Sequence, residues 1–300
     1  MNKLTRSWNI FKKSMIVINR EKKLLIFPLF SCIAMIMLIL LILTGVVTLV
    51  VLSPDTVPEA TTTASTTTAA DSENVSLVAK LIELAVFFVL YLITMLISNF
   101  CSTAFFYEIF RAFNGDQASI SRGFRYALSR FKAIFLWSLV ASTIGVILRA
   151  LQERAGLLGQ IALKLVGVVW AVASCFVIPA LVMDPNLNNP FQALKRSANT
   201  IAQTWGESLI GFVGINVVST VAFLIMLAID LVLGISIALL EIWLPQAILM
   251  GMLFLSFIFF GYLVGVAQSV YKIGLYQYAN GVPNNLFTQE EIAGAFRAKK

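Results

Sequence analysis

The sequence has a few ionisable and amide side chains inside its long apolar runs. These residues are its best candidates for a chemical role. Charged groups are costly at membrane depth, so those found there are candidates for binding or transport. An acid that meets a base at that depth lowers the cost of both charges and leaves room for a charged or zwitterionic ligand. The candidates for such a polar pocket are Asp230, Glu83, Arg149, Lys164, Asn99 and Asn216. The alternative is that the charged groups reach the membrane interface and the amides bond across helices.

The residue types that usually carry catalysis are missing or isolated. The chain has no histidine, which removes the commonest general base and metal ligand. Its three cysteines, Cys32, Cys101 and Cys175, each stand alone in an apolar run. The sequence holds no metalloprotease, serine-hydrolase or nucleotide-binding motif. We therefore expect no enzyme activity, no cofactor and no metal site.

Long apolar helices must position these side chains. Of the 300 residues, 59% are hydrophobic and 12% are charged, whereas soluble domains have about 45–50% apolar and about 25% charged residues. A helix crossing a hydrocarbon layer about 30 Å thick needs about 20 apolar residues, and continuous runs favour helices over a barrel. The runs cover residues 24–52, 77–107, 132–151, 161–182, 208–240 and 246–270. We predict an all-α transmembrane helical bundle of six spans.

The basic residues sort the connections between these runs into two classes. Eighteen of the 22 Lys and Arg precede the first run or follow the second, fourth and sixth. Basic connections stay cytoplasmic, so we predict a multi-pass protein of the plasma (inner) membrane with both termini in the cytoplasm. The net charge of +7 then indicates contact with anionic lipid headgroups, and not with nucleic acid.

The chain is predicted to form a single membrane domain over residues 1–300, with three segments outside the spans. Residues 1–23 form a cytoplasmic amphipathic segment, 53–76 an external disordered Thr-rich loop, and 281–300 a cytoplasmic tail. Residues 119–132 are predicted to form an interfacial helix with Phe124, Ala127, Leu128 and Phe131 in one apolar stripe. Such helices anchor to lipid or dock a cytoplasmic partner. The candidate contact residues are Arg122, Arg125, Arg130, Lys195 and Arg196.

Two blocks of sequence resemble a known group of proteins. The first runs from Trp8 to Lys22-Lys23-Leu24-Leu25-Ile26-Phe27-Pro28. The second runs from Phe176-Val177-Ile178-Pro179-Ala180-Leu181 to Ala193-Leu194-Lys195-Arg196-Ser197. The pattern resembles a family of uncharacterised six-span prokaryotic integral membrane proteins. It is more distantly similar to the membrane domain fused to some glycerophosphodiester phosphodiesterases. The resemblance implies no known activity, cofactor or catalytic residue, and the soluble phosphodiesterase domain is missing.

Three functions stay open on the sequence alone. The first is a non-catalytic membrane scaffold or accessory subunit that recruits protein partners through its basic inner loops. The alternative is a transporter or permease-like protein for a small or lipid-like substrate, which predicts a polar cavity near Asp230, Glu83 or Asn99. An intramembrane enzyme acting on lipid would need two or more acids close together, as acid–base pairs require.

Overall fold

The computed structural model describes residues 16–52, 69–238 and 243–280. The predictions for residues 1–15, 53–68 and 281–300 lie outside this described part. The elements in chain order are η1 (Lys22–Leu25), α2 (Ile26–Leu52), α3 (Ala69–Phe113), α4 (Ile120–Ser129), α5 (Phe131–Arg154), α6 (Leu157–Ser174), α7 (Val177–Met183), α8 (Pro190–Ala238) and α9 (Trp243–Ala279). The all-α prediction is confirmed over the described residues.

Five helical stretches of the described residues are long and apolar enough to cross a membrane. They are Lys22–Thr44, Leu84–Phe113, Phe131–Arg154, Leu157–Met183 and Gly251–Gln277. Within α8, the stretch Ser219–Ile235 is apolar but shorter. The sequence predicts six spans, and the described residues contain five helices that are long and apolar enough to be spans.

Local chemistry explains where several helices begin and end. α3 is followed by Gly115 at φ 92°, a conformation that glycine adopts without steric cost. α8 begins at Pro190 after Asn189, whose Oδ1 accepts a hydrogen bond of 2.9 Å from the Phe191 N–H. An Asn cap before a first-position proline is a strong helix start.

One predicted boundary is wrong. The Thr-rich loop was expected to extend from residue 53 to residue 76, yet α3 already begins at Ala69. Residues 69–76 contain alanine, valine and acidic residues, without the threonines or prolines of the preceding stretch. Acidic residues also suit the first turns of a helix. The loop therefore ends earlier than its composition suggested.

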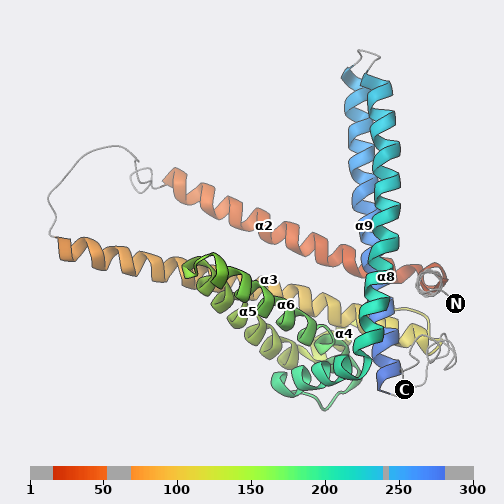
Figure 1. Ribbon diagram of the computed structural model, residues 1–300, viewed down its shortest axis with the longest axis horizontal. Helices are drawn as coiled ribbons and strands as arrows, with labels where there is room; N and C mark the ends of the chain where they lie inside the picture. Colours follow the sequence, from red (N-terminus) through yellow and green to blue (C-terminus); the bar gives the residue numbers. More distant parts are fainter. Residues whose placement is uncertain (1–15, 53–68, 239–242, 281–300) are drawn as a thin grey trace.

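The helices diverge from one end of the molecule (Figure 1). α3 lies between α2 on one side and α5 on the other, and its C-terminal part also contacts α4, α7 and α9. α8 and α9 form a long hairpin that stands at a wide angle to the other long helices. All of the long helices meet near α4 and α7.

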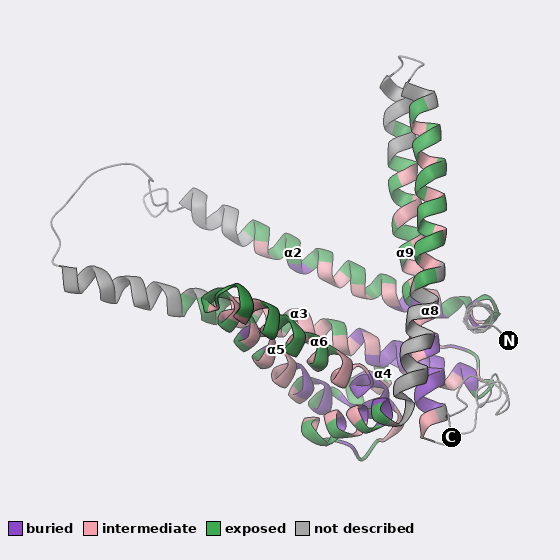
Figure 2. Cartoon of the chain, in the orientation of Figure 1, coloured by how far each residue is buried: buried purple, intermediate pink, exposed green. Residues whose placement is uncertain are grey.

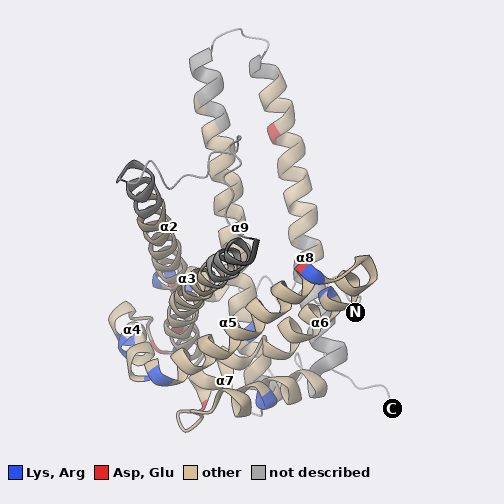
Figure 3. Cartoon of the chain, turned by 90° about the vertical axis from the view of Figure 1, so that its left-hand side faces the viewer, with Lys and Arg blue, Asp and Glu red and all other residues tan. Residues whose placement is uncertain are grey.

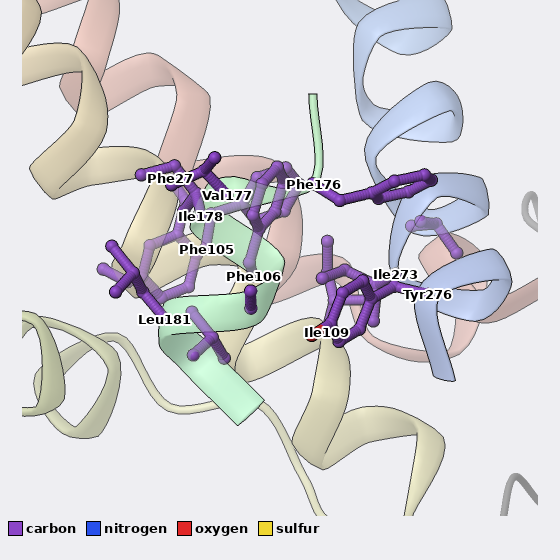
Figure 4. Close-up of a cluster of buried hydrophobic side chains, with 14 of the residues drawn as sticks. Phe27, Phe105, Phe106, Ile109, Phe176, Val177, Ile178, Leu181, Ile273 and Tyr276 are labelled. Carbon is purple, nitrogen blue, oxygen red and sulfur yellow. The ribbon is translucent and has the colours of Figure 1, made fainter. Parts of the chain in front are cut away.

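The buried core lies at this meeting point and not along the length of the helices (Figure 2). Figure 4 shows its centre, where aromatic and aliphatic side chains from α2, α3, α7 and α9 pack together. Phe27, Phe113, Phe176 and Tyr276 are among the largest side chains that are fully buried there. We call this end of the molecule the elbow cap and define it as η1 with residues 104–130, 176–201 and 266–280.

Apolar side chains on the outer parts of α2, α6, α8 and α9 are largely exposed. Leu41 in α2, Leu165 in α6 and Phe254 in α9 are each more than 60% exposed. Exposed apolar surface on this scale marks membrane or protein contact.

The amphipathic helix at 119–132 faces differently from the prediction. Gly123 and Ala127 of α4 are buried, and the Phe124 ring packs against Phe27 and Phe100. Leu128, which was expected in the same stripe, is 66% exposed. The stripe is therefore divided between the protein core and the surface, because one side of α4 packs against α3.

Candidate functional site

A buried carboxylate organises the start of α4. Glu108 on α3 has no exposed surface. Its Oε1 accepts from Arg122 Nε at 2.9 Å, and its Oε2 accepts from Arg122 Nη2 at 2.7 Å and from the Ser119 N–H at 2.7 Å. A buried carboxylate is tolerated when its oxygens are paired in this way. The hydrogen bond to Glu108 raises the pKa of Arg122, so the guanidinium stays charged.

The segment before α2 is tied to the same turn. Glu21 Oε2 accepts a hydrogen bond of 2.9 Å from the Ala118 N–H. Arg111 and Asp116 form an ion pair of 2.9 Å across the turn between them. The acids of this turn are therefore engaged by groups of the protein itself.

Arg130 holds a second turn from the other side. This residue, between α4 and α5, is 9% exposed. Its Nη2 donates to Leu187 O at 2.7 Å and to Asp184 O at 3.3 Å. Its Nη1 donates to Asn188 Oδ1 at 3.1 Å and to Pro185 O. The acceptors follow the C-terminus of α7, where a positive charge is favoured by the helix dipole.

Three more side chains fix the elements on either side of this second turn. Tyr126 on α4 donates its hydroxyl to Val182 O at 2.7 Å, and burial raises the pKa of its phenol. Arg196 on α8 forms an ion pair with Asp184. Ser197 Oγ accepts from the Phe176 N–H at 3.0 Å and donates to Ala173 O at 2.6 Å. These bonds join α4, α7 and α8 around one short segment.

We call residues 184–189 the presented turn. Its side chains at Pro185, Asn186, Asn188 and Asn189 are exposed, while Leu187 points into the core. The backbone is nevertheless held by a buried arginine, an ion pair and the Asn189 cap. The turn is thus an exposed loop with a fixed shape.

The structure separates the predicted cytoplasmic contact residues into two groups. Arg122, Arg130 and Arg196 make internal ion pairs or hydrogen bonds. Arg125 and Lys195 are exposed. Charge at the first group supports the fold, and charge at the second is free to meet something outside the molecule.

The predicted pocket residues are found on different elements and with different partners. Asn99 on α3 donates from Nδ2 to Ser138 Oγ on α5 at 2.9 Å. Arg149 pairs with Glu153 one turn away at 3.0 Å, and its guanidinium lies 4.3 Å from the centre of the Phe87 ring. The structure therefore joins Asn99 and Arg149 to neighbours outside the predicted set.

The remaining members of that set are Lys164, Asp230, Glu83 and Asn216. Lys164 on α6 is exposed. Asp230 on α8 is half-buried, and its Oδ2 atom is buried without a hydrogen-bond partner in the described part of the chain. The side chains of Glu83 and Asn216 lie outside the described residues.

Sequence reasoning missed Glu108 and Asp184, the two acids that pair with the predicted arginines. Glu108 stands among Phe105, Phe106, Ile109 and Phe110. An acid within such an aromatic run, with an arginine shortly after the next turn signal, is the pattern that could have found this pair.

Comparison with known proteins places the chain in a family. Residues 81–284 match a family of unknown function, DUF6159. This range contains the elbow cap from α3 to α9, but not η1 or α2. No curated protein and no solved structure matches the chain, and no link to the membrane domain of glycerophosphodiester phosphodiesterases is found. The match covers more than half of the sequence, so the chain belongs to the family of unknown function DUF6159.

Proposed function

We propose that this protein is an integral membrane scaffold or accessory subunit without catalytic activity, and that it recruits a protein partner through the presented turn. One observation carries the proposal: Arg130, itself buried, holds an exposed turn through three backbone carbonyls and the side chain of Asn188. Burying a guanidinium costs several kcal/mol unless its donors are well paired. Here the two terminal nitrogens of Arg130 donate to a surface loop, and its Nε has no hydrogen-bond partner in the described part of the chain.

A fixed surface loop suits binding because less entropy is lost when the partner docks. Loops on rigid scaffolds carry a large share of protein binding sites. The first two turns of α8 extend the exposed surface with Phe191, which is 64% exposed, and Lys195. Aromatic residues are enriched in protein interfaces, so the Phe191 ring supports a role in docking.

The proposal places the elbow cap in the cytoplasm. Within the part of the chain that the structure describes, the connections at this end of the helices carry most of the basic residues, and basic connections stay on the cytoplasmic side. Five apolar helices long enough to cross a membrane lead away from it. A cytoplasmic partner would then meet the presented turn directly.

Site-specific photocrosslinking in the native membrane tests this function. A photoreactive phenylalanine analogue at Asn186 or Phe191 is expected to capture one discrete protein. The same analogue at Leu158, 82% exposed in the first turn of α6, is the matched control and should not capture that protein. Arg130→Lys should reduce the crosslink, because a lysine cannot reach several carbonyls in one plane. The control variant Arg149→Lys should leave the crosslink unchanged.

Two results would contradict the scaffold. One is the same crosslinked protein from Leu158, and the other is crosslinking to lipid alone from both turn positions. A thermal melt of each variant separates loss of binding from loss of folding.

A transporter for a small or lipid-like substrate is the second candidate, and Asp230 favours it. A half-buried acid whose Oδ2 has no hydrogen-bond partner among the described residues lies in the apolar hairpin of α8 and α9. Such acids at membrane depth often serve proton or ion movement. Proteoliposomes carrying a pH-sensitive dye test this: proton leak lost in Asp230→Asn supports the transporter, and equal leak in both proteins opposes it.

A further inference from the structure

A second exposed surface, at the junction of the elbow cap with α5, has a chemistry different from that of the presented turn. Where α4 meets α5, Leu128, Phe131 and Phe135 are 66%, 44% and 37% exposed. Arg125 and Lys132 flank them and are also exposed. Arg125 and Leu128 lie three residues apart on α4, and Phe131 and Phe135 lie four residues apart on α5, so each pair occupies one side of its own helix. We call these five residues the α4–α5 strip.

The basic groups of the strip have no acid to neutralise them among the described residues. Glu108, Asp116 and Asp184 pair with Arg122, Arg111 and Arg196. Glu21 is bonded to a backbone N–H. The charges of Arg125 and Lys132 are therefore open to a partner outside the molecule. Figure 3 shows blue Lys and Arg segments at α4, among others spread over the cartoon.

The apolar part of the strip continues into a helix suited to cross a membrane. α5 is apolar from Phe131 to Arg154, and Phe131 and Phe135 lie in its first two turns on the exposed side. Leu128 lies about one turn before them. If α5 crosses a bilayer, Leu128 lies near the level where acyl chains give way to headgroups, with Arg125 and Lys132 beside it.

We propose that the α4–α5 strip binds anionic phospholipid of the leaflet that covers the elbow cap. Arg125 and Lys132 contact the headgroup phosphates, while Leu128 and Phe131 contact the upper acyl chains. Charge complementarity and continuity with α5 favour lipid over a protein partner. A phospholipid offers phosphates to the basic residues and acyl chains to the apolar residues. This binding does not depend on the scaffold proposal, since it uses none of the presented turn.

Lipid titration followed by native mass spectrometry measures this binding on the full chain. The probes are phosphatidylglycerol and phosphatidylcholine, added to delipidated protein. Each basic residue at a membrane surface contributes about fivefold to the attraction, so Arg125→Gln with Lys132→Gln should weaken phosphatidylglycerol binding by roughly 25-fold. Phosphatidylcholine binding should change little. The control, Arg154→Gln with Lys164→Gln, removes two exposed basic residues elsewhere and should bind as the unaltered protein does.

Equal losses in the two double variants would overturn the site, because any basic residue would then serve. Displacement of phosphatidylglycerol by equimolar inorganic phosphate would also overturn it, by assigning the strip to a soluble anion. A spin label at Leu128→Cys, with the native cysteines replaced, checks depth in nanodiscs of equal parts phosphatidylglycerol and phosphatidylcholine. Oxygen should reach the label better than a water-soluble nickel complex does; the reverse order would place the strip in water, as for a protein-docking surface.

Discussion

The pairing of Glu108 with Arg122 is the contact on which the start of α4 depends. The carboxylate is fully buried, whereas the side chain of Arg122 is 34% exposed. Removing the acid would leave the Ser119 N–H without its acceptor and would cost Arg122 both bonds to the carboxylate, although its bond to Gln117 O would remain. Removing the exposed acid Glu153 would free Arg149 into solvent, where surface pairs contribute about 0–1 kcal/mol.

Glu108→Ala should therefore lower the free energy of unfolding by about 3 kcal/mol or more. Glu153→Ala, its matched control, should lower it by less than about 1 kcal/mol. Unfolding in mixed micelles of increasing dodecyl sulfate content measures both. Equal small losses would show that the buried pair does not stabilise the elbow cap.

Tyr126 gives the elbow cap a dependence on alkaline pH. Burial raises its pKa above the ordinary value of 10.0, so the folded protein holds this proton more tightly than the unfolded chain does. The resulting stability is fully present below pH 10 and is lost as the pH rises through the higher folded value. The phenolate also cannot donate to Val182 O.

Tyr126→Phe should cost about 1 kcal/mol at neutral pH, the usual worth of one hydrogen bond. The difference between the variant and the unaltered protein should shrink above pH 10. Parallel thermal melts from neutral to alkaline pH follow that difference. A gap that stays constant, or widens, would show that this phenol does not carry the pH effect.

Close packing of α4 against α3 explains why the helix presents a different face from the one predicted. Gly123 has no side chain, and a Cβ built there would lie 2.9 Å from the Phe27 ring and 3.0 Å from Ala104 O. A Cβ at Gly167 on α6 would meet nothing within 4 Å. The two glycines therefore differ in surroundings, although both lie inside helices.

Gly123→Ala should destabilise the protein by about 1–3 kcal/mol, because overpacking displaces Phe27. Gly167→Ala should be neutral or stabilising by up to about 1 kcal/mol, since alanine is the better helix former. Chemical unfolding of the two variants measures the contrast. If both variants gained stability, the packing of α4 on α2 and α3 would be wrong.

At the level of elements, apolar runs and turn residues predicted the helices but not their contacts. The runs beginning at 77 and 132 fall within α3 and α5, and the run beginning at 24 continues from η1 into α2. Periodicity placed Ala127 and Leu128 in one stripe, yet their exposure differs because α3 covers only part of α4. Which partner covers a helix is set by distant residues, and local spacing carries no such information.

The same limit applies to the candidate site. The sequence singled out Arg122 and Arg130 from their place in a basic loop, but not that both would turn inward. Their acceptors include Glu108 on α3 and backbone carbonyls of the presented turn, 54 to 57 residues beyond Arg130 in the chain. A backbone carbonyl acceptor has no signature in residue type, so only the fold could reveal this contact.

On the scale of the whole molecule, the hairpin of α8 and α9 stands at a wide angle to α2 and α3. Transmembrane helices tilt by about 0–40° from the membrane normal. The α8–α9 hairpin and the pair α2 and α3 can cross one bilayer only if the angle between them becomes smaller, with the elbow cap as the pivot. The exposed apolar surfaces that face the space between them would then approach each other.

Spin labels at Leu41→Cys and Phe254→Cys, both on exposed positions, should therefore be closer in lipid nanodiscs than in the present structure. A pulsed dipolar measurement gives that distance. Labels at Phe191→Cys and Leu128→Cys, within the elbow cap, provide the control and should keep the distance of the structure. An unchanged distance between α2 and α9 in lipid would contradict crossing by both groups.

The central claim is that the elbow cap lies on the cytoplasmic side of a membrane that the apolar helices cross. Labelling of single cysteines with a membrane-impermeant maleimide tests it most directly, in a chain whose Cys32, Cys101 and Cys175 are replaced. Asn186→Cys in the presented turn should react only when the cytoplasmic face is opened. Gly156→Cys, between α5 and α6, should react from outside intact cells; the opposite pattern, or reaction of both from one side, would contradict the claim.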